Sequence, residues 1–505
     1  MHWITRLPLI VLLVGLGAVS MLVPAFHAYL VRDLETARAF LYSSVMFAFL
    51  FAMIAVATSN YTIRRQGRSH LISLFALFAI LPAMLAVPFS EVVTDTTFGN
   101  AYVEMVSSLT TTGFTLFDAE RLPPSVHLWR ALVAWLGGFF MWVAAIAIFA
   151  PLNLGGFEVV AATESGRDQK GGVVRLDHIG EPSERLARFA VRLAPIYGGL
   201  TAVLWVILMM AGDAPLVALC HAMATLSTSG ISPLDSGVAG TASGFGGEVM
   251  ILLFLLFALS RLTFTSDGRQ DGWPTLYRDP ELRLGISLIL VLPALLFLRH
   301  WLATIEDGAD VTLLEGILGL WGAVFTVASF LTTTGFESDA WGEARAWSGL
   351  DAAGLVLMGL AVFGGGVATT AGGVKLLRVY ALVKHGQREM EKLVSPSSVG
   401  GSGQVARRFR RQGAYVAWVF FMLFALSIAT ISTTLAFFGL SFEEALVLTI
   451  ASLSTTGPLV DVAADTPIDL IALAPGAKAI LAAAMVLGRL ETLAIIALLN
   501  PEFWR

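Results

Sequence analysis

Long apolar runs, separated by short polar segments, occupy almost the whole of this chain. A helix needs about 20 consecutive and mostly apolar residues to cross a bilayer, and ten runs come close to that length. We therefore expect membrane-crossing helices at 7–31, 39–63, 70–90, 128–152, 188–212, 247–266, 281–302, 350–380, 413–438 and 476–499. The pattern predicts an all-α polytopic membrane protein whose first run is kept as a helix rather than removed as a signal peptide.

Four further apolar stretches are too short to cross, and each ends in the same phrase of hydroxyl residues and glycine. The phrases are Leu109–Gly113, Leu226–Gly230, Leu331–Gly335 and Leu453–Gly457, with glycines 117, 105 and 122 residues apart. Because internal repetition marks a repeated structure, we expect four helix–pore-helix–helix units in a pseudo-fourfold arrangement. The expected divisions are two leading helices in 1–69 and units in 70–187 (with a cytoplasmic loop), 188–280, 281–412 and 413–505.

The short stretches carry signals for helix starts. Ser441 and Glu444 have the spacing of a capping box, and Asp213 and Thr312 are candidate N-caps of two other short helices. Each short helix would then run inward and point its carboxyl end, which carries partial negative charge, at the bilayer centre. Irregular backbone at that depth needs protein or water around it, so the four phrases must converge on one another.

A dehydrated monovalent cation needs oxygen atoms in place of its water, and the phrases offer hydroxyls and backbone carbonyls. None contains a carboxylate, so divalent ions are not specially favoured. The alternative, helix packing through small residues, fits poorly because packing motifs repeat at helical spacing. The candidate ligands for a potassium ion are Thr111, Thr112, Gly113, Thr228, Ser229, Gly230, Thr333, Thr334, Gly335, Thr455, Thr456 and Gly457.

Charge placement predicts the orientation in the membrane. The chain is 56% hydrophobic and only 14% charged, with a net charge of −5. Segments 212–248, 303–344 and 439–477 contain no Lys or Arg. The intervening segments are basic through Arg64, Arg65, Arg68, Arg167, Lys170, Arg175, Arg185, Arg188, Arg261, Arg269, Arg278, Arg283, Lys384, Arg388, Lys392, Arg407, Arg408, Arg410 and Arg411. The positive-inside bias places these segments and the amino terminus in the cytoplasm.

The opposite side is expected to be acidic. One aspartate follows each phrase glycine by four or five residues, at Asp118, Asp235, Asp339 and Asp461. Carboxylates around a pore mouth raise the local concentration of cations. Ordinary solvated loop residues are the alternative interpretation.

Glycines interrupt the apolar run at 350–380. Each costs about 1 kcal/mol relative to alanine inside a helix, so we expect a broken helix with an irregular loop that lines a water-filled cavity. A close helix crossing through small residues is the alternative. The loop contains Gly364, Gly365, Gly366, Thr369, Thr370, Gly372 and Gly373, and we expect Lys375 and Arg378 beyond it at the cytoplasmic edge.

Arg489 lies about 13 residues, or about 20 Å, into the last apolar run. A charge at that depth is expensive and marks a functional site by default. We expect Arg489 to face the ion path and to pair with carbonyl groups of the glycine-rich loop. A structural salt bridge, for instance with Glu104, is the alternative. Glu491 is two residues away on another helix face, which makes it a poor direct partner.

The four phrases, the segment Gly364–Lys375, the segment Leu487–Glu491 and the ending Asn500–Arg505 resemble one known family. From end to end, the chain is similar to the TrkH-type membrane subunit of the Trk/Ktr/HKT cation-transport superfamily. This resemblance implies potassium uptake across a bacterial inner membrane, a homodimer with one pore in each subunit, and a TrkA-like cytosolic nucleotide-binding regulatory ring. It also implies that the glycine-rich loop gates the pore, and from its depth in the membrane we expect the charge of Arg489 to oppose the ion and contribute to this gate.

Two residues depart from the regular phrase: Ser229 in the second and Pro458 directly after the fourth. Proline lacks an N–H group, so we expect one quarter of the filter to be reshaped. Glycine in all four phrases resembles the potassium pattern of the superfamily.

No nucleotide-binding loop or catalytic motif is present, so we expect neither an enzyme, a cofactor in this chain nor a nucleic-acid partner. The competing hypotheses are a proton- or sodium-coupled symporter, for which Glu104 is the candidate acid, a less selective cation channel, and a membrane enzyme or scaffold.

Overall fold

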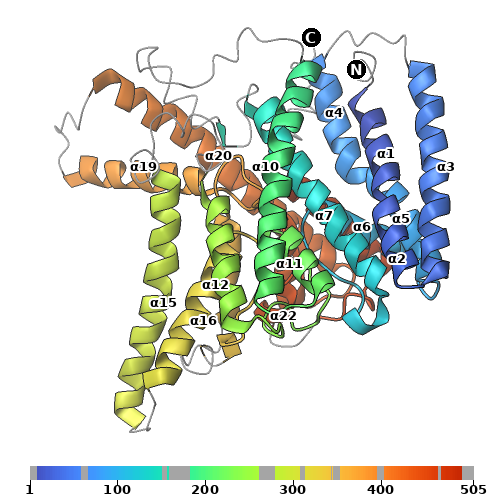
Figure 1. Ribbon diagram of the computed structural model, residues 1–505. Coiled ribbons are helices and arrows are strands. Elements are labelled where there is room, and N and C mark those ends of the chain that lie inside the picture. Colours follow the sequence, from blue (N-terminus) through green and yellow to red (C-terminus); the bar gives the residue numbers. More distant parts are fainter. Residues whose placement is uncertain are drawn as a thin grey trace.

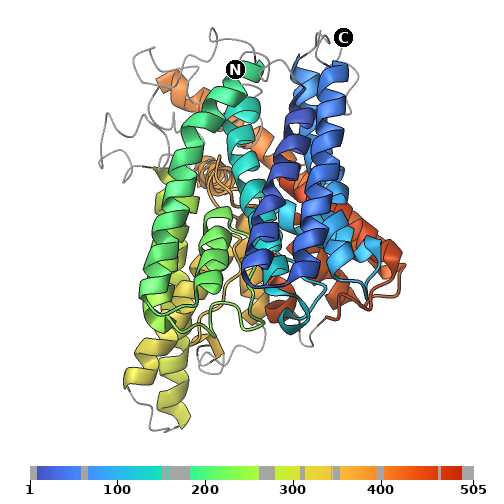
Figure 2. The same cartoon turned by 45° about the vertical axis from the view of Figure 1, so that its right-hand side comes forward.

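The computed structural model describes residues 8–58, 66–150, 156–157, 182–260, 279–307, 313–342, 344, 353–394, 403–464 and 468–491. Every regular element among them is a helix. Long helices form the outside of the bundle and shorter helices end within it (Figures 1 and 2). Seven of the described helical segments are long and apolar enough to cross a membrane: Leu9–Leu30, Leu34–Thr58, Leu71–Val92, Pro124–Phe149, Leu186–Met210, Pro280–Leu298 and Gly413–Ala436. The predicted all-α membrane class is confirmed.

The two leading spans form a pair at one edge of the bundle, opposite α15 (Figure 1). The first consists of α1 (Leu9–Ser20) and α2 (Leu22–Leu30), and the second is α3 (Leu34–Thr58). α2 packs against α3 and α7, and the ring of Phe40 lies edge-on to that of Trp129 with centroids 5.5 Å apart. The pair therefore covers the outside of the first repeat.

In each of the first two repeats, the helix that leads into the phrase lies between two other helices. The first consists of α4 (Gln66–Ala79), α5 (Leu81–Val92), α6 (Phe98–Leu109), the turn η2 (Ala119–Arg121), α7 (Pro124–Ala144) and its π-helical end η3 (Ala145–Phe149). The second consists of α10 (Pro182–Met210), α11 (Pro215–Ser227), α12 (Gly244–Leu255) and the turn η5 (Leu256–Leu259). α11 packs between α7 and α10, which places the second phrase beside the first repeat.

The last two repeats follow the same order. The third consists of α15 (Pro280–Asp307), α16 (Leu313–Leu331), α18 (Ala353–Phe363) and α19 (Leu376–Val394). The fourth consists of α20 (Gly403–Ala436), α21 (Phe442–Leu453), α22 (Leu459–Ala463) and α23 (Pro475–Leu490). α21 packs against α20 and α23, and α23 also contacts α6. The fourth repeat therefore packs against the first.

Three predicted spans are shorter than the sequence indicated. The run 247–266 is helical only to Leu259, and the helix within 476–499 ends at Leu490 among the described residues. The run 350–380 is broken between Phe363 and Leu376, which confirms the expected interruption by glycine. The proposed division into units at 69, 187, 280 and 412 stays a prediction.

Helix capping agrees with the sequence in one place and differs in another. The Ser441 and Glu444 side chains form the predicted capping box at the start of α21. Asp213 does not cap α11, which begins at Pro215 with no side-chain cap. Its carboxylate instead accepts hydrogen bonds from the backbone N–H (2.8 Å) and hydroxyl (3.0 Å) of Ser243, the residue before α12. Thr312 lies outside the described residues.

Many of the residues that predict the orientation lie outside the described part of the chain: Arg64, Arg65, Arg167, Lys170, Arg175, Arg261, Arg269 and Arg278. The ending Asn500–Arg505, which contributes to the family resemblance, also lies outside it. The cytoplasmic placement of the amino terminus therefore stays a prediction. The placement of Lys375 and Arg378 at the cytoplasmic edge also stays a prediction; their side chains are buried, with 4% and 0% exposure. Lys375 Nζ donates a hydrogen bond to the Ala371 carbonyl, and Arg378 Nη1 donates to the Val374 carbonyl at 3.1 Å, so carbonyl groups of the glycine-rich loop replace water.

Candidate functional site: four filter phrases and the loop beneath them

All four phrases share one unusual backbone turn. The second residue after the leucine is a threonine with a φ angle between +52° and +58° in each phrase. A β-branched residue rarely adopts this left-handed conformation, so its occurrence four times at one position marks a functional constraint. The four residues are Thr111, Thr228, Thr333 and Thr455.

This turn ends each short helix and frees the carbonyl groups that follow. The N–H of the next residue bonds back to a carbonyl of the short helix in every phrase, at 2.8–3.0 Å. The donors are Thr112, Ser229, Thr334 and Thr456, and the acceptors are Ser107, Ala224, Ser329 and Ala451. Because the chain leaves the helix at this turn, the carbonyl groups of the phrase have no N–H partner in a following helical turn. Such oxygens can serve as ligands for a cation.

Each phrase glycine lies against a residue of the next phrase. A Cβ atom added to Gly113 would lie 1.9 Å from the Ser229 carbonyl oxygen, and one on Gly230 would lie 2.1 Å from that of Thr334. One on Gly335 would lie 2.8 Å from Pro458 Cγ. One on Gly457 would lie 2.3 Å from the backbone nitrogen of Phe114. Each phrase therefore contacts the next, and the fourth contacts the first, so the contacts form a closed ring.

Hydroxyl groups within each phrase are paired at equivalent positions. The first and third residues after the leucine are hydrogen-bonded through their side chains at 2.8, 3.0, 3.1 and 3.2 Å in the four phrases. The Oγ1 atoms of Thr111 and Thr455 are buried and have no hydrogen-bond partner within the described part of the chain. Buried polar atoms are rarely left unpaired, so these two hydroxyls are suited to an ion at the inner end of the ring.

The fourth phrase differs from the other three. Gly113, Gly230 and Gly335 have positive φ angles of 80°, 66° and 85°, whereas Gly457 does not. The Gly457 N–H donates a hydrogen bond to the Thr112 carbonyl oxygen at 2.5 Å. Pro458 is the close neighbour that a side chain on Gly335 would meet. The backbone of the fourth phrase therefore differs from that of the other three, as expected from the proline at position 458.

The glycine-rich loop, residues 364–375, lies against the inner ends of three phrases. Its Gly372 N–H donates to Thr333 Oγ1 at 2.7 Å, and its Thr370 hydroxyl donates to the Leu226 carbonyl at 3.2 Å. A Cβ on Gly372 would lie 2.2 Å from the Ser454 carbonyl oxygen. The loop is thus hydrogen-bonded to the second and third phrases and tightly packed against the fourth.

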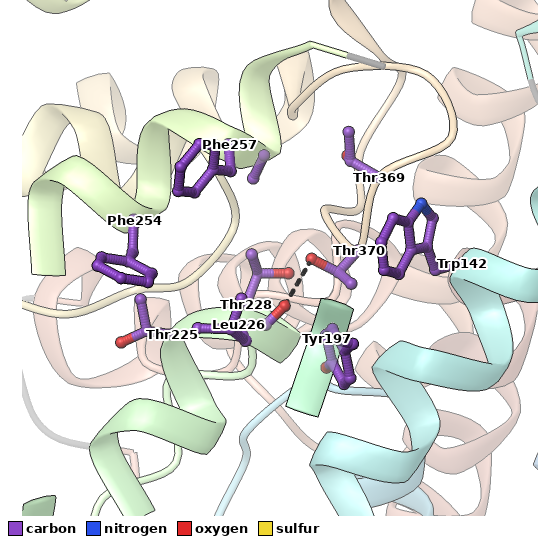
Figure 3. A pocket seen from close by; sticks show the side chains of 10 residues that line it. Trp142, Tyr197, Thr225, Leu226, Thr228, Phe254, Phe257, Thr369 and Thr370 are labelled. Carbon is purple, nitrogen blue, oxygen red and sulfur yellow. Dashed lines mark hydrogen bonds between the residues drawn. The ribbon is translucent and has the colours of Figure 1, made fainter. Parts of the chain in front are cut away.

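Figure 3 shows the cavity beside this contact. The Thr370 side chain points toward the end of α11 and forms the hydrogen bond to Leu226, whereas the Thr369 hydroxyl donates to the Gly366 carbonyl within the loop at 2.7 Å. Trp142 and Tyr197 line the same cavity. Leu226 and Thr228 of the second phrase also line it, so the cavity lies between the loop and this phrase and has both hydroxyl-bearing and aromatic walls.

Arg489 is buried, with 2% exposure, and its Nη1 atom donates to the Thr370 carbonyl at 2.6 Å. The expected pairing with the loop is therefore confirmed. Glu104 and Glu491, the two acids considered as ion-pair partners of Arg489, pair with other arginines. Glu104 is paired with Arg130 at 2.6 Å, and Glu491 is paired with Arg378 at 2.7 Å.

The Arg378–Glu491 pair was missed from the sequence. It joins the first turn of α19 to the residue directly after α23, and the Arg378 guanidinium lies 3.7 Å from the centre of the Phe420 ring. The available signal was the position of Arg378, close behind an apolar and glycine-rich segment, because a cation there needs an anionic or aromatic partner.

The aspartates after the phrases are all exposed: Asp118, Asp235, Asp339 and Asp461. Asp235 also accepts a hydrogen bond from the Ala119 N–H at 2.7 Å, which links the second repeat to the first. Partial withdrawal from water raises the pKa of the Asp461 carboxyl, and the negative charge of Asp235 raises it further. These two carboxylates therefore share one electrostatic environment. Among the described residues, no group of His, Cys, Asp and Glu is arranged to hold a metal ion.

Comparison with known proteins gives consistent matches. The sequence profile of a family described as "TrkH: Cation transport protein" matches residues 288–503. The "Trk system potassium uptake protein TrkH" of Halomonas elongata is 30% identical over 444 residues, which cover 86% of this chain and 84% of the relative. The protein with the same description from Salmonella typhimurium is 29% identical over 516 residues, covering all of both chains.

A solved structure has the same fold. It is described as "Crystal Structure of the Potassium Transporter TrkH from Vibrio parahaemolyticus", and it matches with a TM-score of 0.80 at 24% identity over the full length of both chains. The likeness therefore extends over the leading helices and all four phrase-bearing segments.

Proposed function

Because this chain belongs to the TrkH family of cation transport proteins, we propose that it carries potassium ions through the ring of filter phrases into the cell. The observation that supports this best is the closed series of contacts among Gly113, Gly230, Gly335 and Pro458, and from Gly457 back to the first phrase. Four short helices that end at one ring offer a cation both carbonyl oxygens and the negative ends of helix dipoles.

The proposed filter works by replacing water. A potassium ion that enters the ring loses hydration and gains carbonyl oxygens of the phrases. The ligands are backbone oxygens of residues 111–113, 228–230, 333–335 and 455–457, with the unpaired hydroxyls of Thr111 and Thr455 at the inner end. The glycines allow the close approach of neighbouring phrases, because any side chain on them would meet the next phrase.

We assign the gate to the glycine-rich loop with Arg489. The loop covers the inner side of the ring through Thr370 and Gly372. Arg489 holds the loop by its Thr370 carbonyl and adds a positive charge near the path. A positive charge raises the barrier for a cation. Ion flow then requires that the loop leave the phrases, with Gly364, Gly365, Gly366, Thr369 and Gly373 in the part that moves.

The coupled symporter is less well supported. It needs an acid within the membrane that gains and loses a proton during transport, and Glu104 was its candidate. The Glu104 carboxylate is fully buried, paired with Arg130 at 2.6 Å, and it accepts a hydrogen bond from the Leu116 N–H at 2.9 Å. Protonation would break this pair and leave a buried arginine without its counter-charge.

The remaining assignments concern the surroundings of the chain. We propose a bacterial inner-membrane protein with a cytoplasmic amino terminus, which the distribution of Lys and Arg between alternate segments supports. The family resemblance further suggests a homodimer and control by a TrkA-like nucleotide-binding ring on the cytoplasmic side. Co-purification with such a ring and the mass of the detergent-solubilised complex would test both.

The function is tested by ion flux into liposomes that contain the purified protein. We expect uptake of rubidium or potassium that is driven by the membrane voltage, with a reversal potential that follows the potassium gradient alone. A reversal potential that shifts with pH or with the sodium gradient at fixed potassium would favour coupled transport. Absence of any cation flux with well-folded protein would contradict the proposal.

A further inference from the structure

A buried polar residue occupies the same position of the short helix in each of the first three repeats. It lies nine residues before the phrase glycine, and its exposed fraction is 0% in each case. The residues are Glu104 on α6, His221 on α11 and Thr326 on α16. Their chemistry differs, as one is acidic, one an imidazole and one a hydroxyl, but their position relative to the filter is the same.

Each of these side chains reaches the segment that leaves the filter, two or three residues after the glycine. Glu104 Oε2 accepts from the Leu116 N–H at 2.9 Å. The His221 Nε2 and Ser232 Oγ atoms are hydrogen-bonded at 2.9 Å. Thr326 Oγ1 accepts from the Ser338 N–H at 3.3 Å. We call these three hydrogen bonds the braces, because each ties the leaving segment of a phrase to the helix that precedes that phrase.

The fourth repeat is built differently at this position. Nine residues before Gly457 lies Leu448, which is buried and apolar. The leaving segment there folds into α22 (Leu459–Ala463). Its phrase is held from the side of the ring instead, by the Gly457–Thr112 hydrogen bond and the packing of Pro458. The braces therefore belong to the three phrases whose glycines have positive φ angles.

His221 contacts two neighbouring phrases at once. Besides its bond to Ser232 in its own repeat, its ring lies edge-on to Phe336, with centroids 5.7 Å apart. Phe336 directly follows Gly335, the glycine of the third phrase. The position of the His221 ring thus links the outer ends of the second and third quarters of the filter.

The positions of the phrase carbonyl oxygens depend on how the backbone is held both before and after the phrase. The short helix fixes the entering end through the N–H bonds to its last turn, but the leaving end is irregular backbone. Recognition of an ion requires ligand positions to be held to within about 0.5 Å by surrounding residues. Further hydrogen bonds hold the same segments among the described residues: the Ser107 hydroxyl donates to the Phe114 carbonyl at 2.8 Å, and Glu248 of α12 accepts from the Ser338 hydroxyl at 2.8 Å. The braces act together with these contacts, and their equivalent positions in three repeats suit them to this task.

We propose that Glu104, His221 and Thr326 are positioning residues that set the ion preference of the filter, and that His221 couples two of its quarters. This inference rests on the proposed function, since it assumes that potassium passes through the ring. It predicts that loss of one brace changes which ion passes, rather than whether the protein folds.

The test compares potassium and sodium permeability in liposomes for brace variants. His221→Leu removes the bond to Ser232 but keeps a side chain of moderate size. We expect its potassium-over-sodium ratio to fall about fivefold, the factor that corresponds to one neutral hydrogen bond. His221→Gln places an amide group at the reach of Nε2, and we expect it to restore most of the ratio. A purely space-filling role would not distinguish leucine from glutamine in this way.

Thr326→Val supplies a second and milder test, because it exchanges a hydroxyl for a methyl group with little change of shape. Its matched control is Thr449→Val on α21. Thr449 is also fully buried, but its hydroxyl bonds to Ser432 of α20 and not to a leaving segment. We expect a lower ratio for Thr326→Val and an unchanged ratio for Thr449→Val.

Three outcomes are distinct. Lower ratios in His221→Leu and Thr326→Val, with recovery in His221→Gln, would support the inference. A wild-type ratio in both Thr326→Val and a folded His221→Leu, while the unmodified protein selects potassium, would overturn the inference and leave the proposed function intact. Failure of the unmodified protein to pass potassium would overturn the proposed function itself.

Discussion

The Nη1 atom of Arg489 lies 2.6 Å from the carbonyl oxygen of Thr370, to which it donates a hydrogen bond. This contact joins α23, the last described helix of the fourth repeat, to the glycine-rich loop of the third. A guanidinium at membrane depth is costly unless protein or water compensates it. Its charge is therefore placed where it holds a loop that covers the inner side of the ring.

Replacement of Arg489 tests this contact. Arg489→Gln removes the charge and weakens the hold on Thr370, so we expect faster potassium flux and more frequent openings. The measurement is single-channel recording or initial uptake rate in liposomes. Lys384→Gln is a suitable control, because it also removes one positive charge but lies exposed on α19. Equal fluxes in the two variants would indicate that Arg489 has only a structural role.

Gly372 gives a second test of the loop, from its other side. A Cβ on this residue would lie 2.2 Å from the Ser454 carbonyl oxygen and 2.3 Å from Thr455 Oγ1. We expect Gly372→Ala to push the loop away from the fourth phrase and to increase the open fraction several-fold, since ~1 kcal/mol changes an equilibrium about fivefold. Gly359→Ala on α18 is the control, because an added Cβ there meets nothing within 4 Å. A silent Gly372→Ala variant would argue against tight packing between loop and phrase.

The convergence of the four phrases was predictable from the sequence because the same signal is repeated four times. The conformation of the phrases was not, since left-handed threonine at Thr111 and its three counterparts contradicts the local preference of a β-branched residue. Such a turn is stabilised by the surrounding ring, and no single phrase contains that information. The order in which the phrases contact one another is likewise a property of the assembled repeats.

The broken helix was predictable for an energetic reason, because clustered glycines make a continuous helix costly. The burial of Lys375 and Arg378 was not, because a basic residue after an apolar run normally marks the membrane edge. Their partners come from distant parts of the sequence: Arg378 bonds to Glu491, 113 residues away. Long-range pairing of this kind leaves no local pattern.

The phrase glycines are expected to be sensitive to any side chain. Gly113→Ala would combine a φ angle of +80° with a Cβ placed 1.9 Å from the Ser229 carbonyl oxygen. We expect a fall of roughly tenfold in potassium preference over sodium, equivalent to ~1.4 kcal/mol of lost discrimination, and a similar effect for Gly335→Ala. Gly237→Ala separates strain from contact, because Gly237 has a φ angle of +62° but nothing within 4 Å of its added Cβ. An unchanged permeability ratio in Gly113→Ala would contradict the filter assignment.

The Glu104–Arg130 pair is expected to matter for stability more than for ion preference. Both side chains are buried, with 0% and 3% exposure. Glu104→Gln leaves Arg130 without its counter-charge, so we expect a loss of about 3 to 5 kcal/mol in stability. The Gln side chain can still accept from Leu116, so the ion preference should persist. Thermal unfolding in detergent measures the first effect, and the double variant Glu104→Gln/Arg130→Met should recover most of it. Equal stabilities of the single and double variants would contradict the assignment of the loss to the uncompensated charge of Arg130.

We expect potassium flux to depend on pH and salt because of the exposed aspartates that follow the phrases. The pKa of Asp461 is raised above its usual 3.8, first by partial removal from water and then by the charge of Asp235. Its carboxylate is therefore negative above the raised pKa and becomes neutral as the pH falls through that value, while an isolated aspartate is still charged. Since the negative charge concentrates cations at the mouth, we expect potassium uptake at low ionic strength to decline over this acidic range.

Asp461→Asn should show a lower uptake at neutral pH and a weaker decline on acidification, because the group that titrates has been removed. The difference from the unmodified protein should shrink in high salt, where the Debye length falls from about 10 Å at 0.1 M to about 3 Å at 1 M. Uptake measured across a pH series at two ionic strengths provides both readouts. If the variant and the unmodified protein follow the same pH profile at low salt, Asp461 does not contribute to cation enrichment. A decline that is steeper in the variant would place the titrating group elsewhere, with Asp235 as the next residue to replace.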